Sequence, residues 1–250
     1  MVAERWAPRE VQVDLLEGFE LRLDGEVIEL PLGAQRLIAF LALHNRPLQR
    51  SFVANSLWLD SSEERAGANL RSALWRLHQG SRPVVDARGT QLRLVPDASV
   101  DLHHASGLAR RMIAEDAIIE TTESFEIAAM GELLPDWYED WILVERERFR
   151  QLRLHALEAF CERLTAAGRF AQAIEAGLGA VAGEPLRESA HRALIAAYIA
   201  EGNAGEAIRQ YRMCERLLRD DLGIEPSPLI RELFVSMPGV ADGSVQPATT

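Results

Sequence analysis

Two stretches in the C-terminal half of the chain repeat each other at a spacing of 34 residues. The matching pairs are Phe160 with Leu194, Leu164 with Tyr198, Gly168 with Gly202, Ala173 with Ala207, Ile174 with Ile208 and Gly177 with Tyr211. Small residues allow two helices to cross closely, glycine suits the turn between paired helices, and large apolar residues fill the space between them. This half of the chain is therefore expected to form stacked helix pairs.

A period of 34 with this pattern is typical of tetratricopeptide units. Pro185 is expected to end the first unit, and the second continues through a longer helix to residues 222–226. Two units alone would leave apolar faces exposed, so we expect a further helix pair, from about Ala105 to Ile119 and from about Trp137 to Arg163. In the second of these helices, Trp137 and Trp141 are expected to face the same core.

The first 95 residues follow a different pattern. Alternation of apolar and polar residues predicts strands over 11–15, 19–23 and 27–30, with a turn at Asp24-Gly25. Helical periodicity predicts helices from residue 34 to before 46, from 51 to 59, and from 61 or 62 to about 79. Ser61 and Ser62 both offer caps for the third helix, and Ser61 with Glu64 offers a capping box.

Two short strands are predicted within residues 84–94, about a turn at Arg88-Gly89. Together with the preceding segments they give the order sheet, three helices, hairpin. This order predicts a winged helix-turn-helix at the N-terminus.

The third predicted helix has two distinct sides. Its apolar residues fall within one arc: Ala66, Leu70, Ala73, Leu74 and Leu77. The opposite side is polar, and it carries residue types that contact base edges or phosphates. With the second helix and the wing, the candidate DNA contacts are Arg65, Asn69, Arg71, Ser72, Arg76, Arg50, Arg88 and Arg93. Trp75 is expected to pack under the wing. The alternative is a solvated helix with an ordinary polar face.

The distribution of charge singles out the same region. The chain has a net charge of −11, and its 27 basic residues are all arginine. Residues 33–95 carry nine arginines against four acidic residues, a net charge of +5, whereas residues 1–32 and 96–250 carry −5 and −11. A basic segment within an acidic protein is typical of a surface that binds an anionic partner. Chance clustering of arginines is the alternative.

Composition and motifs argue against several other classes of protein. With 250 residues, 48% of them hydrophobic and 26% charged, the chain is typical of a globular protein of one large or two medium domains. No apolar run approaches the ~20 residues of a membrane-spanning helix, and the N-terminus lacks the apolar stretch of a secretion signal, so we expect a cytoplasmic protein without a membrane partner. No phosphate loop, zinc-protease or serine-hydrolase motif is present, so we expect no enzymatic activity and no cofactor.

The remaining candidate groups favour structural roles. Cys161 and Cys214 are too few for a disulfide framework or a cysteine-rich zinc site and are expected in the core. The adjacent pair His103-His104 has no third ligand nearby, so a place at the domain junction is favoured over metal binding. The basic stretch Arg146, Arg148, Arg150 and Arg153 could bind a phosphorylated ligand, although alternating charge on a long helix usually forms a solvated, salt-bridged face.

Several segments, in order along almost the whole chain, resemble the SARP-type (antibiotic regulatory protein) activators of actinobacteria. The matching segments are GFELRLDGEVIELP, QRLIAFLALH, NLRSALWRLH, VDLHH, ELLPDWYEDWILVERERFRQLRLHALEAF and LRESAHRALIAAYIAEGNAGEAIRQYRMCERLLRDDLGIEPSPLIRELF. Members of this family join an OmpR-type winged helix to a bacterial transcriptional activator domain. The chain departs from them after the third helix, where His78-Gln79-Gly80-Ser81 replaces the further arginines that are usual in the family.

The resemblance implies a mainly α fold with a small β component. The expected domains are a winged helix-turn-helix DNA-binding domain (8–96), a tetratricopeptide-like activator domain (97–236) and a disordered tail (237–250). The implied function is a transcriptional regulator, an activator that binds promoter DNA by its third helix and wing and contacts RNA polymerase holoenzyme. Whether the protein binds DNA as a homodimer, and whether an effector binds the helical domain, stays open. The alternative is a tetratricopeptide interaction module whose winged helix serves as a docking platform.

Overall fold

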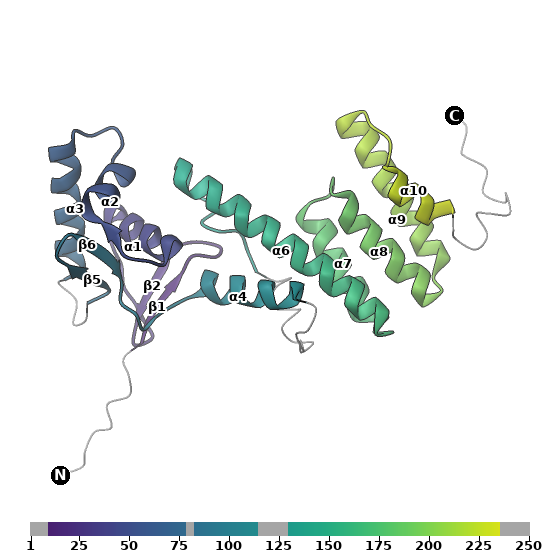
Figure 1. Ribbon diagram of the computed structural model, residues 1–250, viewed down its shortest axis with the longest axis horizontal. Coiled ribbons are helices and arrows are strands. Elements are labelled where there is room, and N and C mark those ends of the chain that lie inside the picture. Colours follow the sequence, from purple (N-terminus) through teal and green to yellow (C-terminus); the bar gives the residue numbers. More distant parts are fainter. Residues whose placement is uncertain (1–9, 79–82, 115–129, 236–250) are drawn as a thin grey trace, which may run out of the picture. The chain divides into compact units, whose positions relative to one another are not determined.

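The computed structural model describes residues 10–78, 83–114 and 130–235 of the chain (Figure 1). Within these ranges the chain forms two compact units, one from residues 10–78, 83–105 and 131–148 and the other from residues 106–114, 130 and 149–235. The fold is mainly helical with a small strand component, which confirms the predicted fold class. The predicted tail, residues 237–250, lies outside the described residues, and the predicted domain boundary between residues 96 and 97 stays a prediction.

A four-stranded sheet begins the first unit. Its strand order is β3-β2-β1-β7, formed by β1 (Val11–Asp14), β2 (Glu20–Leu23), β3 (Glu26–Val27) and β7 (Ala98–Val100). Asp24 and Gly25 both have positive φ, 55° and 84°, as the tight hairpin turn between β2 and β3 requires. The sequence did not predict β7, which pairs in parallel with β1.

Three helices and a small second sheet complete the winged helix (Figure 1). The helices are α1 (Leu32–His44), α2 (Arg50–Leu57) and α3 (Glu63–Leu77), and the sheet contains β4 (Leu48–Gln49), β6 (Gln91–Leu94) and β5 (Val85–Arg88) in that order. The backbone N–H of Arg65 donates to Oγ of Ser62, which is the N-cap of α3. Of the two predicted caps the structure therefore uses Ser62, and the predicted capping box of Ser61 and Glu64 is wrong.

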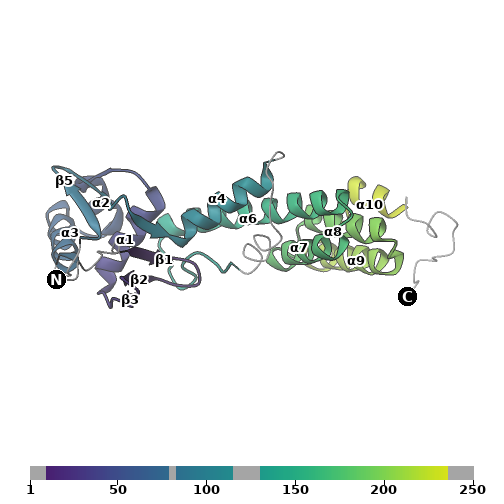
Figure 2. The ribbon, with the colours of Figure 1, turned by 90° about the horizontal axis from the view of Figure 1, so that it is seen from below.

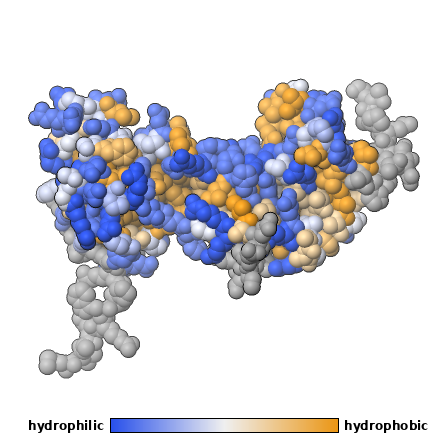
Figure 3. Space-filling view, viewed as in Figure 1, coloured by the Kyte–Doolittle hydropathy of each residue, from blue (hydrophilic) through white to orange (hydrophobic). Residues whose placement is uncertain are grey.

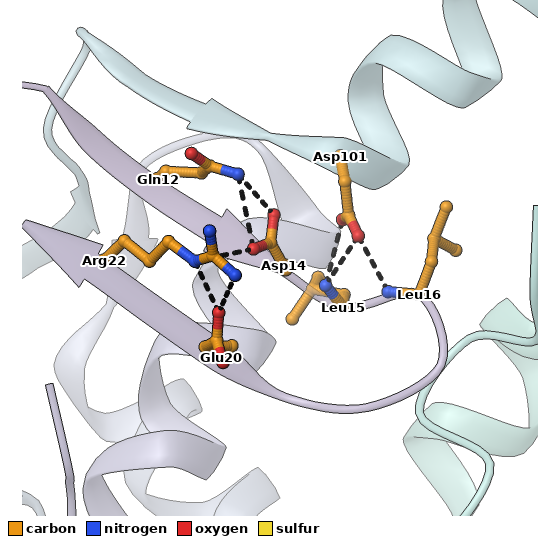
Figure 4. Close-up of polar contacts among 7 residues, drawn as sticks. All are labelled: Gln12, Asp14, Leu15, Leu16, Glu20, Arg22 and Asp101. Carbon is orange, nitrogen blue, oxygen red and sulfur yellow. Dashed lines mark hydrogen bonds and ion pairs between the residues drawn. The ribbon is translucent and has the colours of Figure 1, made fainter. Parts of the chain in front are cut away.

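The carboxylate of Asp101 connects the end of β1 to the start of the next helix, α4 (Asp101–Ile113). Its oxygens accept hydrogen bonds from the backbone N–H groups of Leu15 and Leu16, at 2.8 to 2.9 Å, as Figure 4 shows. Beside it, Asp14 accepts a hydrogen bond from Gln12, and Arg22 lies between Asp14 and Glu20. Polar contacts thus fix the end of the sheet at which β7 leads into α4.

Residues 131–148 complete the core of the first unit. Leu133 forms an isolated antiparallel bridge with Leu16 in the loop after β1. The ring of Trp137 stacks on Phe19, with centroids 5.9 Å apart, and the ring of Trp141 meets Phe40 of α1 edge to face at 5.2 Å. The two tryptophans therefore pack on the winged helix, and their predicted place in the core of the helical repeats is wrong.

The second unit contains the helical repeats (Figure 2). Its helices are the later parts of α4 and α6 (Asp140–Ala166), then α7 (Phe170–Gly183), α8 (Glu188–Glu201), α9 (Ala204–Leu217), a π-helical turn η1 (Leu218–Leu222) and α10 (Pro228–Val235). Gly168 and Gly202, matched in the 34-residue repeat, adopt positive φ at the turns after α6 and α8. A Cβ atom on Gly177 would lie 3.1 Å from Leu194, so this glycine allows the predicted close helix crossing.

One apolar cluster joins the later parts of α4 and α6 to α7 and α8. It includes Leu108, Met112, Phe160, Leu164, Ala173, Ala180, Leu194 and Ala197. A second cluster joins α8, α9, η1 and α10, and in it the rings of Tyr211 and Phe234 stack with centroids 3.9 Å apart. The stacked helix pairs predicted from the repeat are confirmed, and α4 and α6 supply the further pair that the repeat needed.

The surface differs between the two units. In Figure 3, hydrophilic residues dominate the visible face of the first unit, and hydrophobic residues gather over the C-terminal helices. The exposed large apolar residues of the second unit are Ile113, Leu178, Met213, Leu222, Ile224, Leu229 and Val235. Within the described ranges, we find no helix with both the length and the apolar character needed to cross a membrane.

Candidate nucleic-acid interface

Helix α3 buries one side against the winged helix and exposes the other. Its buried residues are Ala66, Leu70, Ala73, Leu74 and Leu77, the five predicted from helical periodicity. Five candidate DNA contacts are exposed: Arg65, Asn69, Arg71, Ser72 and Arg76. Because the apolar stripe holds α3 in place, the polar side chains are presented from a rigid element.

The charge along α3 changes sign within the first turn. Glu63 and Glu64 occupy that turn, where acidic side chains favour the positive end of the helix dipole. The arginines begin at Arg65 and continue to Arg76 in the last turn. The part of α3 available to an anionic partner therefore extends from Arg65 to the C-terminal end.

Three of the candidate contacts line one hollow beside α3. Its volume is about 290 Å³, and its walls are Pro31, Gly33, Ala34, Trp58, Asn69, Ser72, Ala73 and Arg76. An amide, a hydroxyl and a guanidinium thus converge beside the first turn of α1. These groups together accept and donate hydrogen bonds as a base edge requires, and the guanidinium also suits a phosphate.

Trp75 does not pack under the wing, contrary to the sequence prediction. Its side chain is 58% exposed, and the guanidinium carbon of Arg76 lies 5.3 Å from the centre of its ring. The distance is within the range of a cation–π interaction. The indole therefore belongs to the exposed side of α3.

The two candidate arginines of the wing share one acidic partner. Asp86 on β5 lies opposite Arg93 on β6 and accepts two hydrogen bonds from it, both at 3.0 Å. Nε of Arg88 donates to the same carboxylate at 3.1 Å. Desolvation raises the pKa of Asp86, but the hydrogen bonds and charges of Arg93 and Arg88 outweigh it and hold the pKa below its ordinary value. Asp86 is therefore ionised and offsets part of the positive charge of the wing.

Sequence reasoning missed Asp86, although a signal was present. A hairpin turning at Gly89-Thr90 places Asp86 directly opposite Arg93, and opposite charges at such positions attract. The expected turn lay one residue earlier, at Arg88-Gly89, and gave no reason to pair the two side chains.

Arg50 lies at the start of α2 and is half-buried. Its backbone N–H donates to the carbonyl of Thr90 in the wing turn, at 2.8 Å. Its side-chain Nε is buried and has no hydrogen-bond partner among the described residues. Arg50 is therefore tied to the wing turn by its backbone, while its guanidinium is less accessible than those on α3.

The basic stretch on α6 forms internal contacts. The guanidinium of Arg146 donates to the carbonyls of Leu133, Leu134 and Trp137. The other three arginines bind Glu145, Glu184 and the carbonyl of Met130, in the order Arg148, Arg150 and Arg153. Two of the four arginines are thus salt-bridged, as the sequence suggested, and two bind backbone carbonyls; these contacts weigh against a site for a phosphorylated ligand.

The other candidate groups also have structural surroundings. Nε2 of His103 lies 2.8 Å from the carbonyl oxygen of Ala42. Cys161 and Cys214 are buried, as predicted, and burial raises the pKa of each thiol to about 12. Across the described parts of the chain, no group of three or more His, Cys, Asp or Glu side chains is placed to hold a metal ion.

Comparison with known proteins gives one family match. Residues 99–236 match the bacterial transcriptional activator domain. Regulatory protein AfsR of Streptomyces coelicolor is 27% identical over 225 residues, which is 84% of this chain and 22% of that protein. Transcriptional regulatory protein EmbR of Mycobacterium tuberculosis is 28% identical over 254 residues, 93% of this chain and 64% of that protein. The chain therefore spans about a fifth of AfsR and less than two thirds of EmbR.

A shorter match and a solved structure agree with this. Transcriptional regulator RedD of Streptomyces coelicolor is 36% identical over 83 residues, 33% of this chain and 24% of that protein. The structure of Mycobacterium tuberculosis EmbR in complex with a low-affinity phosphopeptide is similar with a TM-score of 0.69 and 23% identity. It covers 94% of this chain and 68% of that one, and the likeness supports the fold.

Proposed function

The chain belongs to the SARP-type regulators, in which a bacterial transcriptional activator domain follows a winged helix, and from this premise we propose that it is a sequence-specific DNA-binding activator of transcription. Its partner is double-stranded promoter DNA. The observation that carries the proposal is the division of α3 into a buried apolar stripe and an exposed side with three arginines, an asparagine and a serine.

The proposed contacts divide by chemistry. Arg76, Arg65 and Asn69 contact base edges, because guanidinium and amide groups form two hydrogen bonds at once with guanine or adenine in the major groove. Ser72 and Arg71 bind a base or a phosphate. Arg50 and the wing arginines, Arg88 and Arg93, contact phosphates and fix the position of the protein on the duplex.

We assign activation to the helical unit. Stacked helix pairs present extended surfaces for protein partners, and the proposed partner is RNA polymerase holoenzyme. Two further questions are open to measurement. One is whether two copies of the chain bind DNA side by side, and the other is whether an effector binds the helical unit. We propose that the chain acts without enzymatic activity and without a cofactor.

One observation favours a second candidate function. Asp86 offsets charge on both wing arginines, which weakens the wing as a phosphate-binding element. A tetratricopeptide interaction module that uses its winged helix as a docking platform for another protein is the alternative.

The experiment that separates these functions is a DNA selection followed by a salt titration. The purified full chain selects fragments of genomic DNA from its source, and the best fragment is titrated by fluorescence anisotropy at several salt concentrations. With five to eight phosphate contacts, log K should fall linearly with log salt at a slope of roughly −4 to −7. No enriched fragment, or binding that is indifferent to salt, would support the docking module.

Activation is tested on the same fragment. Transcription in vitro with purified polymerase should increase when the full chain is added. A chain ending at residue 148 retains all of the first compact unit and should bind the fragment without stimulating transcription. Stimulation by the shortened chain would contradict the assignment of activation to the helical unit.

A further inference from the structure

Trp75 lies in the last turn of α3, near the centre of its exposed side when the helix is viewed along its axis. At 3.6 residues per turn, it is about 160° around the helix from the centre of the buried stripe. Arg71 and Arg76 lie on either side of it, at about 120° and 100° from that centre. On the side of α3 that points away from the core, Trp75 is therefore a large apolar ring between two cations.

An exposed indole at this position has an unfavourable contact with water, which burial in a complex would remove. Its 58% exposure is matched by exposure of the charged residues on either side of it, Arg71 and Arg76. Tryptophan and arginine are both enriched at protein interfaces, so the residue types alone do not select the partner. The charged side chains beside the ring are all positive, which suits a partner with apolar groups set between anionic ones.

The major groove of DNA is such a partner. Its rims carry phosphates, and its floor presents the C5-methyl group of every thymine. An indole on the outward side of a helix that lies in the groove would face the floor, while the arginines on either side reach base edges and phosphates. The position of the ring and the charges beside it thus point to one apolar contact, the methyl group of a thymine.

We propose that Trp75 contacts the methyl group of a thymine in the major groove and also positions Arg76 for a neighbouring base. The proposal rests on the proposed function and adds to it one residue that determines sequence preference. The guanidinium of Arg76 lies 5.3 Å from the ring centre, so it has less conformational freedom to lose on binding than an arginine without such a contact.

The test removes the methyl group from the DNA and the ring from the protein. In the selected duplex each thymine is replaced in turn by uracil, which lacks only the C5-methyl group. One position should bind the full chain about fourfold more weakly, which corresponds to about 0.8 kcal/mol for one buried methyl or methylene group. With Trp75→Ala the same replacement should have no effect, because in a double-mutant cycle the contact is already absent.

Two further variants control for other causes. Trp75→Phe retains an apolar ring and should keep part of the uracil effect. Tyr138→Ala removes another exposed aromatic side chain of the first unit and should leave affinity and the uracil effect unchanged. Circular dichroism melts of all variants should coincide, since Trp75 and Tyr138 are both exposed.

Several outcomes would overturn the proposal. They are uracil effects of equal size in the full chain and in Trp75→Ala, no uracil effect at any position, or a Trp75→Ala variant that binds DNA normally and loses only stimulation by polymerase. In each of these cases DNA binding itself would stand. Absence of DNA binding by the unaltered chain would instead remove the proposed function, and this inference with it.

Discussion

The guanidinium of Arg36 on α1 lies 2.9 Å from the carboxylate of Glu139, in the segment just before α6. The same guanidinium donates a hydrogen bond of 2.7 Å to the carbonyl of Leu57, the last residue of α2. One arginine thus joins the second helix of the winged helix to residues that follow it far along the sequence. Both side chains of the ion pair are largely shielded from solvent, so the pair differs from an ordinary surface contact.

Replacing Glu139 by glutamine should destabilise the first unit. Arg36 would keep its bond to Leu57 but lose its charged partner in a poorly solvated position. We expect the free energy of unfolding to fall by about 1 to 2 kcal/mol, between the values for exposed and buried pairs. Urea unfolding followed by circular dichroism measures this. The control is Arg148→Gln, which removes a more exposed ion pair between Arg148 and Glu145, both in α6. It should change the free energy of unfolding by less than about 0.5 kcal/mol.

Local patterns explain why much of both units could be predicted. The apolar spacing on α3 depends only on helix geometry, and it identified all five buried residues. The 34-residue repeat likewise located the turns at Gly168 and Gly202, because a small residue there is required by the backbone. Both are properties of neighbouring residues.

Partners distant in sequence could not be predicted in the same way. The spacing of Trp137 and Trp141 indicates that both side chains are buried, but periodicity does not show in which core. In the structure they pack against Phe19 and Phe40. The strand β7 is three residues long and depends on pairing with β1. A chain cut after residue 95 would therefore lose β7, Asp101 and the residues of 131–148, and we expect it not to retain a stable winged helix.

The positions of the candidate DNA contacts could be predicted from the sequence, but the residues that surround them could not. Helix geometry placed Arg65, Asn69 and Arg76 on the exposed side, and the structure agrees. The pairing of Arg93 with Asp86 depends on the hairpin register, which shifts by one residue with the turn. Whether these residues bind DNA stays a prediction.

Asp101→Ala should destabilise the junction of β1, β7 and α4. The substitution leaves the backbone N–H groups of Leu15 and Leu16 without the carboxylate that accepts their hydrogen bonds. We expect a loss of about 2 to 3 kcal/mol in the free energy of unfolding. Asp101→Asn keeps one acceptor oxygen and should lose less. Asp136→Ala, at an exposed position of the same unit, is the control. Equal stability of all three variants would contradict the role of Asp101.

Stability of the helical unit should decrease in mild acid because of His191. This fully buried ring lies 2.8 Å from the carbonyl of Pro185 and 2.8 Å from the amide nitrogen of Gln210. Burial lowers its pKa below the ordinary value of 6.5, against the opposing effects of Pro185 and the Glu188 charge. The unfolded chain then takes up the proton first, so stability present above pH 6.5 is lost as pH falls below it.

The loss from His191 should be at most about 1 kcal/mol between pH 6.5 and 5.5. Urea unfolding at both pH values measures it for the full chain and for His191→Gln, which has no group that titrates in this range. The variant should be less stable at pH 6.5 but should lose less on acidification. His155→Gln, at an exposed position of the same unit, should follow the unaltered chain. Parallel curves for all three proteins would count against the prediction.

Arg76→Ala and Arg93→Ala should weaken DNA binding in different ways. If Arg76 contacts a base, its removal costs about 1 to 3 kcal/mol on the selected fragment and relaxes discrimination at one position. Removal of Arg93 should weaken binding to all sequences alike and reduce the slope of log K against log salt by about one. Anisotropy titrations on selected and scrambled duplexes distinguish the two. Unchanged binding by both variants would contradict the proposed DNA surface.

Asp86→Asn should strengthen DNA binding without regard to sequence. The amide keeps the size of the side chain and one acceptor oxygen for Arg93, but it removes the negative charge that Arg93 and Arg88 share. Both guanidinium groups then attract phosphates more strongly. We expect affinity to rise several-fold on selected and scrambled duplexes alike, and the salt dependence to steepen by up to about 0.9 for one additional phosphate contact.

A matched change of charge shows whether the effect of Asp86 is local. Glu225→Gln removes the same charge from an exposed side chain outside the winged helix, and it should alter DNA affinity much less, because it frees no arginine of the wing. Equal gains from both variants would mean that net charge alone is responsible. Weaker binding by Asp86→Asn would mean that the carboxylate holds the wing arginines in the orientation that DNA requires, so that its contribution to geometry exceeds the cost of its charge.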